Sequence, residues 1–144
     1  ALGVVPSDLT PFDGRIEVEI KTDKTFSYPA QKALGVSQGY HVFHPGIDIR
    51  APKGSDVTPI ASGVVKVVAS QKYGWGHRIE VDHGGGVVSL YAHLGKMYVE
   101  EGDVVNNETI IGEIGLTGHT TGPHLHLEVR EEGRVVNPVK YITK

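Results

Sequence analysis

Glycine and proline interrupt this chain so often that long helices have little room. The sequence has 19 Gly and 8 Pro in 144 residues, and the longest stretch free of both is the 14 residues between Gly14 and Pro29. Proline removes a backbone hydrogen-bond donor, and an average helix needs about 11 to 12 residues. The spacing therefore favours strands joined by tight turns.

The charge and composition exclude several classes of function. The net charge is −3, and the 14 basic residues are scattered rather than clustered, which argues against a surface for nucleic acid or anionic membrane. No apolar run approaches the roughly 18 residues of a membrane span. The chain has no cysteine, so any metal site must use His, Asp or Glu.

The start of the chain differs from the rest. Residues 1–14 carry two prolines and no periodicity, which is typical of an arm or linker. In 16–20, apolar and charged residues alternate, which predicts a strand with one wet face. The chain begins at Ala1 without a basic flank, so we expect a trimmed segment without a secretion signal. We expect 1–30 to form an N-terminal arm and first strand, and 31–144 the main domain.

Beyond this start, residues 21–56 have no regular pattern, and short strands are predicted from Gly63 onward. Apolar and polar residues alternate between turn signals there, at the even spacing typical of an antiparallel sandwich or barrel. We therefore expect an all-β fold, an antiparallel sandwich or partly open barrel with long irregular loops and little helix. The predicted strands are 63–69, 77–82, 87–94, 97–99, 103–105, 110–114, 124–130 and 134–136.

The stretch HLHLEVR at 124–130 holds two of the eight histidines. Side chains alternate across a strand, so Leu125, Leu127 and Val129 are predicted to face the core. His124 and His126 then share the opposite face with Glu128 and Arg130, close enough to serve one site. The plain alternative is a histidine-rich exposed face.

A second candidate is HPGID at 44–48. Pro45-Gly46 forces a turn, and a bend followed by a strand can aim both His44 and Asp48 at one point. Two histidines and a carboxylate are a standard ligand set for catalytic zinc. Alone, the motif also fits a turn with an incidental histidine and a capping aspartate.

The third candidate, His93, lies in the predicted strand 87–94. Alternation predicts that Val88, Leu90, Ala92 and Leu94 form the apolar face. His93 would then share the other face with Val87, Ser89 and Tyr91, where a site could lie or where a surface histidine would be solvated.

These motifs together resemble the lysostaphin/LytM-type zinc endopeptidases that cut peptidoglycan peptides. The likeness spans about residues 40–139 and implies a barrel of the duplicated-hybrid-motif kind. Its motifs are HPGID (44–48), YAHL (91–94) and TGHTTGPHLHLEV (117–129), supported by APKGSDVTPIASGVV (51–65), GWGHRIEVDHGGG (74–86) and EGDVVNNETIIGEIG (101–115).

The resemblance implies a role for each matching residue. His44, Asp48 and His126 would be zinc ligands, and His93 and His124 the catalytic histidines. Some relatives that have lost ligands act as scaffolds or activators, whereas every matching position is intact here. His77 stands where relatives often have Asn and is interpreted as a rim or turn residue.

Four further residues are weaker candidates for substrate contact. A tyrosine just upstream of the first ligand assists in some relatives. Trp75, between two glycines, is either a loop anchor or an exposed aromatic rim. The four candidates are Tyr40, His41, Trp75 and His119. His83 is not one of them and is interpreted as a turn residue of a glycine-rich hairpin.

The expected function is zinc-dependent hydrolysis of peptide bonds in peptidoglycan stem peptides or cross-bridges, outside the cytoplasm. Zinc lowers the pKa of bound water and polarises the carbonyl. No HExxH motif supplies a glutamate base, so proton transfer falls to His93 and His124. Biotinyl/lipoyl and sugar-phosphotransferase carriers share parts of the pattern but leave the ligand set unexplained. A non-catalytic module that binds peptidoglycan or a hydrolase remains the alternative.

Overall fold

The computed structural model describes residues 26–41, 43–118, 120 and 122–142. The arm predicted at 1–14 and the strand predicted at 16–20 lie outside these residues. Among the described residues there is no α-helix, and no helix could span a membrane. The elements are β1 (Gly35–Gln38), β2 (Ile47–Arg50), β3 (Asp56–Val57), β4 (Gly63–Ser70), β5 (His77–Gly84), β6 (Val87–Met97), β7 (Val104–Val105), β8 (Gly112–Ile114), β9 (His124–Glu131), β10 (Arg134–Val136) and the 3-10 helix η1 (Pro138–Lys140).

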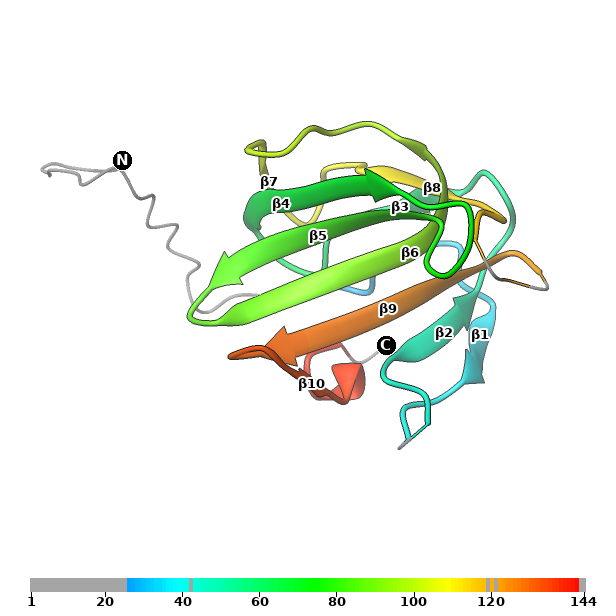
Figure 1. Cartoon of the computed structure of the whole chain (residues 1–144), viewed down its shortest axis with the longest axis horizontal. Coiled ribbons are helices and arrows are strands. Elements are labelled where there is room, and N and C mark those ends of the chain that lie inside the picture. The colour runs from blue at the N-terminus through cyan, green and yellow to red at the C-terminus, as the bar shows by residue number, and fades with distance from the viewer. Residues whose placement is uncertain (1–25, 42, 119, 121, 143–144) are drawn as a thin grey trace, which may run out of the picture.

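All strands join one antiparallel sheet whose main path is β1-β2-β9-β6-β5-β4-β7. Off this path, β10 pairs with β9, and β8 pairs with both β3 and β6. Figure 1 shows β4, β5, β6 and β9 side by side, with β2 and β1 next to β9. The outer strands β1 and β7 are not paired with each other within the described chain. The predicted antiparallel all-β fold is confirmed, as a sheet that does not close.

The region 21–56, predicted to be irregular, contains β1 and β2 and ends at the first residue of β3, so that prediction was wrong. β2 is the important one, because it lies between β1 and β9. Its four residues are too few for a clear alternation, and its main partner comes more than seventy residues later in the chain. Strand preference depends strongly on such tertiary neighbours.

The predicted strand 97–99 is also absent as a separate element. β6 instead runs on to Met97 and changes its partner along the way. It pairs with β9 up to Ala92 and with β8 from Leu94. His93 lies at the point of change, and the backbone turns there.

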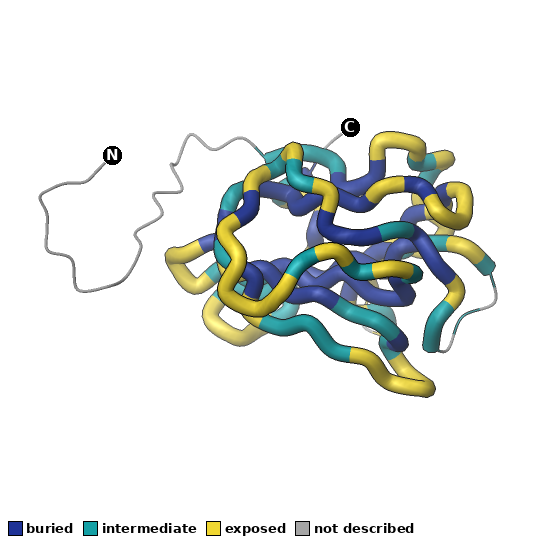
Figure 2. Tube along the Cα trace, turned by 90° about the horizontal axis from the view of Figure 1, so that it is seen from above, coloured by how far each residue is buried: buried dark blue, intermediate teal, exposed yellow. Residues whose placement is uncertain are grey.

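The hydrophobic core lies against one face of the long strands. Leu125, Leu127 and Val129 of β9 are fully buried there, as their alternation predicts. β2 contributes Ile47 and Ile49, which pair with Leu127 and Leu125. Figure 2 shows buried segments through the middle of the molecule and exposed turns around them. The opposite face of β9 is thereby left to polar side chains.

His83 is a core residue, not the turn residue that its sequence suggested. It is 2% exposed at the end of β5. Its Nδ1 lies 2.8 Å from the carbonyl oxygen of Ser62, and its Nε2 lies 2.8 Å from the hydroxyl of Ser89. The Ser89 hydroxyl also contacts the buried hydroxyl of Tyr91, which accepts a hydrogen bond from the Ile60 N–H. Burial lowers the pKa of His83, against the opposing effects of Ser62 and Asp82.

We predict that His83 makes the fold less stable in mild acid. Below its ordinary pKa of about 6.5, the unfolded chain binds this proton before the folded chain does. The free energy of unfolding then falls by up to about 1.4 kcal/mol per pH unit. Urea unfolding at pH 7.5 and pH 5.5 should show a smaller loss for His83→Gln than for the unsubstituted chain. Equal losses would contradict this prediction.

Candidate metal centre and active site

Three side chains of metal-ligating types meet where β2 lies beside β9. Asp48 of β2 pairs in register with His126 of β9, so both side chains stand on the same face of the sheet. His44 reaches them from the preceding turn. This turn needs Gly46, because a Cβ there would lie 2.3 Å from the carbonyl oxygen of Leu127.

The geometry of this group fits a divalent cation. Asp48 Oδ2 lies 3.2 Å from His44 Nε2, and Asp48 Oδ1 lies 2.8 Å from His126 Nδ1. One ligand atom from each residue lies within 4.8 Å of the other two. The side chains of His44 and Asp48 are 12% and 14% exposed, so solvent reaches the centre. Two imidazoles and one carboxylate match the donors that zinc prefers.

Two more imidazoles flank the group. The ring centroids of His93 and His124 are 5.0 Å apart, and those of His93 and His126 are 6.1 Å apart. His124 Nε2 lies 3.7 Å from Asp48 Oδ1. The five residues that the motifs singled out as ligands and catalytic histidines therefore come together in space.

Each of the four imidazoles at this centre has one nitrogen held by an oxygen acceptor. Carbonyl and carboxylate oxygens only accept, so the nitrogen facing them carries the proton. His126 differs from the other three, because its Nδ1 also faces a carboxylate oxygen, Asp48 Oδ1 at 2.8 Å. In a neutral ring of His44, His93 or His124, the other nitrogen keeps its lone pair. The held nitrogens are His44 Nδ1 on Gly39 O (3.0 Å), His93 Nδ1 on Thr117 O (2.8 Å), His124 Nδ1 on Gly122 O (2.9 Å) and His126 Nε2 on Glu128 Oε2 (3.0 Å).

The electrostatics of the centre favour a positive charge. Burial raises the pKa of the Asp48 carboxyl, but the hydrogen bond from His126 and the charges of three neighbouring imidazoles outweigh it, and the pKa falls. Burial lowers the pKa of His126, yet its bonds to Asp48 and Glu128 outweigh burial and raise the pKa to about 9. Two carboxylates thus stabilise a positive charge at His126. While no metal is bound, this charge comes from the second proton on the imidazole ring.

His93 is held in an unusual backbone conformation. Its φ is 64°, in the left-handed region that non-glycine residues seldom adopt. Its N–H donates to the carbonyl oxygen of Trp75 at 2.8 Å. This conformation breaks the alternation of β6, so Tyr91 and Leu94 both lie in the core.

The predicted faces of 87–94 are therefore wrong on the N-terminal side of His93. Ala92 lies opposite His126 and Leu90 opposite Glu128, so both stand on the face of the site. Tyr91, predicted to share the face of His93, is fully buried in the core. His93 reaches the centre because of its backbone turn and not because of a period-2 pattern.

Two glycines bring the loop before β5 against the loop that holds His93. Gly76 has φ 66°, and a Cβ there would lie 2.4 Å from the Thr117 carbonyl carbon. Gly118 has φ 78°, and its Cβ would lie 2.4 Å from Gly76 N. This contact fixes the Thr117 carbonyl that accepts from His93 Nδ1.

The weaker substrate candidates lie at different places. Tyr40 is 38% exposed, and its hydroxyl donates to Val135 O at 3.3 Å. The His41 ring lies 5.8 Å from the His44 ring, so it borders the centre. His119 lies outside the described residues.

Trp75 is a half-buried platform for two arginines. The guanidinium carbon of Arg78 lies 4.9 Å, and that of Arg130 5.7 Å, from the centroid of its ring. The neighbouring His77 is the first residue of β5, and its Nδ1 lies 2.9 Å from Gly95 O. Trp75 is thus packed by charged side chains rather than free at a rim.

Glu128 is the residue at the centre that sequence reasoning passed over. Its side chain holds His126 and is 2% exposed. The alternation of HLHLEVR already puts Glu128 on the face of His126, and that was the available signal. The low exposure and the distance could come only from the fold.

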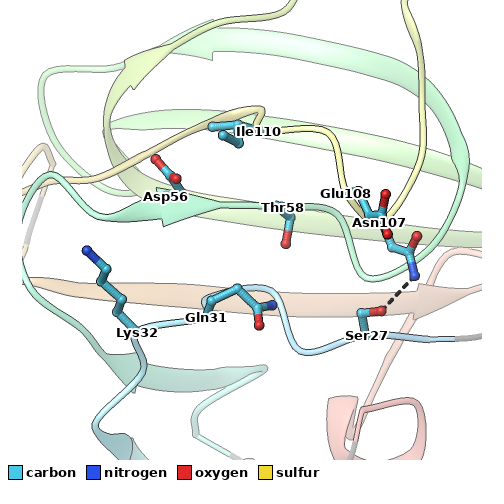
Figure 3. A pocket seen from close by; sticks show the side chains of 8 residues that line it. All are labelled: Ser27, Gln31, Lys32, Asp56, Thr58, Asn107, Glu108 and Ile110. Carbon is cyan, nitrogen blue, oxygen red and sulfur yellow. Dashed lines mark hydrogen bonds between the residues drawn. The ribbon is translucent and has the colours of Figure 1, made fainter.

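A separate pocket opens near the start of the described chain (Figure 3). None of the predicted site residues lines it. The buried hydroxyl of Thr58 is the one buried side-chain polar atom without a hydrogen-bond partner among the described residues. The lining residues are Ser27, Gln31, Lys32, Asp56, Thr58, Asn107, Glu108 and Ile110.

Comparison with known proteins gives one family. Residues 42–138 match Peptidase family M23. The DD-carboxypeptidase/endopeptidase Mpg of Neisseria meningitidis serogroup B is 46% identical over 96 residues, which are 67% of this chain and 22% of that protein. The peptidoglycan DD-endopeptidase ShyA of Vibrio cholerae is 32% identical over 130 residues, 90% of this chain and 28% of that protein. The chain thus spans about a quarter of these relatives.

A solved structure agrees with these relatives. A zinc-containing peptidase from Vibrio cholerae superposes with a TM-score of 0.73 and is 31% identical, covering 79% of this chain and 39% of that one. The resemblance inferred from the motifs is confirmed.

We predict that the contact between Gly76 and Gly118 makes Gly76→Ala costly. The matched control is Gly74→Ala, because Gly74 has a similar φ of 69° but only a side-chain atom 3.6 Å from its Cβ position. Left-handed strain alone costs about 1 to 2 kcal/mol. Urea unfolding should show Gly76→Ala destabilised by at least about 1 kcal/mol more than the control. Equal losses would show that the close approach is not required.

Proposed function

Because the chain belongs to peptidase family M23, we propose that it is a zinc-dependent endopeptidase that hydrolyses peptide bonds of bacterial peptidoglycan. The bonds would be those of stem peptides or cross-bridges. The name of Mpg supports an endopeptidase, and the name of ShyA supports peptidoglycan as the substrate. Peptidoglycan is the wall outside the membrane, so we propose an extracytoplasmic location.

The observation that carries the proposal is the orientation of the four imidazoles. Each has one nitrogen bonded to an oxygen acceptor outside the group of His44, Asp48 and His126, which assigns a proton to that nitrogen. The other nitrogens of His44 and His126 face the Asp48 carboxylate, where a metal ion would take their lone pairs in place of a proton. A surface cluster of histidines would have no reason to share this arrangement.

His44, Asp48 and His126 would hold the zinc ion. Their donor atoms converge within 4.8 Å, and three protein ligands leave a position open, as catalytic zinc sites require. When bound, zinc lowers the pKa of a water molecule and polarises the carbonyl of the scissile bond.

His93 and His124 would move the protons. Burial lowers the pKa of His93, so its imidazole is neutral near pH 7 and Nε2 accepts a proton. His124 holds its Nδ1 proton against Gly122 and presents Nε2 on the same side as Asp48. One of the two would accept a proton from the attacking water, and the other would stabilise the carbonyl oxygen or protonate the leaving amine nitrogen.

We predict that the three proposed ligands are each needed for metal binding. His44→Ala, Asp48→Ala and His126→Ala should each purify with little zinc, because two remaining donors hold the ion poorly. Elemental analysis of freshly purified protein measures this. His41→Ala is the control, since His41 neighbours the centre but lies outside the ligand group. Full zinc content in a ligand variant would contradict the assignment.

We predict that His93→Ala and His124→Ala keep their zinc and lose turnover. General acid–base catalysis is worth about 10²- to 10⁴-fold, so the rate of muropeptide cleavage should fall by at least about 100-fold. Mass spectrometry of digested, defined cross-linked muropeptides measures it. A chain that keeps zinc but cuts no muropeptide would instead support the non-catalytic binding module. Cleavage that survives chelation would remove the proposal of zinc dependence.

A further inference from the structure

One of the four imidazoles at the centre is held differently from the others. Three of them rest on backbone carbonyl oxygens, which are neutral. His126 rests on the carboxylate of Glu128, with Nε2 at 3.0 Å from Oε2. The ligand most deeply placed in the sheet is therefore the one with a charged partner.

Glu128 is itself built into the sheet. It is 2% exposed, and a buried carboxylate is costly unless its oxygens are paired. Its second oxygen, Oε1, lies 3.0 Å from Arg130 Nη2. Arg130 in turn lies over the ring of Trp75. Both carboxylate oxygens thus have a hydrogen-bond partner.

We propose that Glu128 is a positioning residue for the metal, acting through His126. It accepts the Nε2 proton of His126, so that Nδ1, the atom that faces Asp48, is the nitrogen that would give its lone pair to the metal in place of the proton shared with Asp48. The negative charge also makes Nδ1 a stronger donor, as carboxylates behind metal-bound histidines do. Arg130 holds the carboxylate in place. This inference rests on the proposed function only in taking His126 as a ligand.

The sheet contains a matched control for this pair. Leu90 of β6 lies between the two glutamates: it pairs with Glu80 of β5 on one side and with Glu128 of β9 on the other. Glu80 is 6% exposed, bonds Arg78 at 3.1 Å, and Arg78 also lies over Trp75. Glu80 has similar burial and the same kind of partner, but within the described chain it makes no hydrogen bond or ion pair with a proposed metal ligand.

The experiment compares Glu128→Gln with Glu80→Gln in the full chain. Glutamine keeps an oxygen that can accept from His126 and removes the charge. Zinc affinity is measured by competition with a chromophoric chelator, and the Co²⁺-loaded proteins are compared by visible absorption. Glu128→Gln should bind zinc about 10- to 100-fold more weakly and shift the cobalt spectrum. Glu80→Gln should stay within about twofold of the unsubstituted chain.

Urea unfolding of the metal-free proteins separates positioning from a structural role. If Glu128 served stability alone, both variants would lose stability and neither would change in zinc affinity, which would overturn the proposal. Should Glu128→Gln not fold, Arg130→Gln keeps the carboxylate but removes its support. It should weaken zinc binding less than His126→Ala does and still shift the cobalt spectrum; an unchanged affinity and spectrum would overturn the proposal.

The same measurements keep this inference apart from the proposed function. A chain that binds no zinc, or His126→Ala with undiminished affinity, would remove the proposed metal centre. Zinc binding that depends on His126 but is indifferent to Glu128→Gln would leave the metal centre standing and overturn only the role of Glu128.

Discussion

The structure depends on the antiparallel pairing of β2 with β9. Ile47 and Ile49 face Leu127 and Leu125 across this pair, and all four side chains are buried. Because side chains alternate, a slip of one residue would expose this apolar set. The core therefore fixes the register, and the register places Asp48 directly opposite His126. Hydrophobic packing on one face thus sets the geometry of the polar residues on the other.

A second constraint, a backbone turn, brings His93 to the centre. The left-handed conformation of His93 is supported by the Trp75 carbonyl and coincides with the change of partner along β6. The loop of Thr117 holds its Nδ1, and the contact of Gly76 with Gly118 holds that loop. Strain of this kind persists only where neighbouring structure over-determines it.

The buried and polar faces of a strand could be predicted where apolar and polar residues alternate along that strand. The alternation of HLHLEVR predicted the buried and polar faces of β9 correctly, because both faces are set by local pleating. β2 could not be found in this way, since its strand character comes from partners distant in the chain. The faces of β6 were wrong because alternation assumes an extended backbone, which His93 does not have.

The sequence by itself determined the residue types of the centre, the polar face of β9 and the resemblance that named the family. Only the tertiary structure decided which imidazole nitrogen is held and by what. His44 and His93 are held by the backbone carbonyl oxygens of Gly39 and Thr117. No side-chain pattern encodes the position of a backbone carbonyl. Glu128 is a neighbour in sequence, yet its burial between His126 and Arg130 follows from the packing above the sheet. Hydrogen-bond geometry is a property of distances between atoms, and the chain acquires those distances only when it folds.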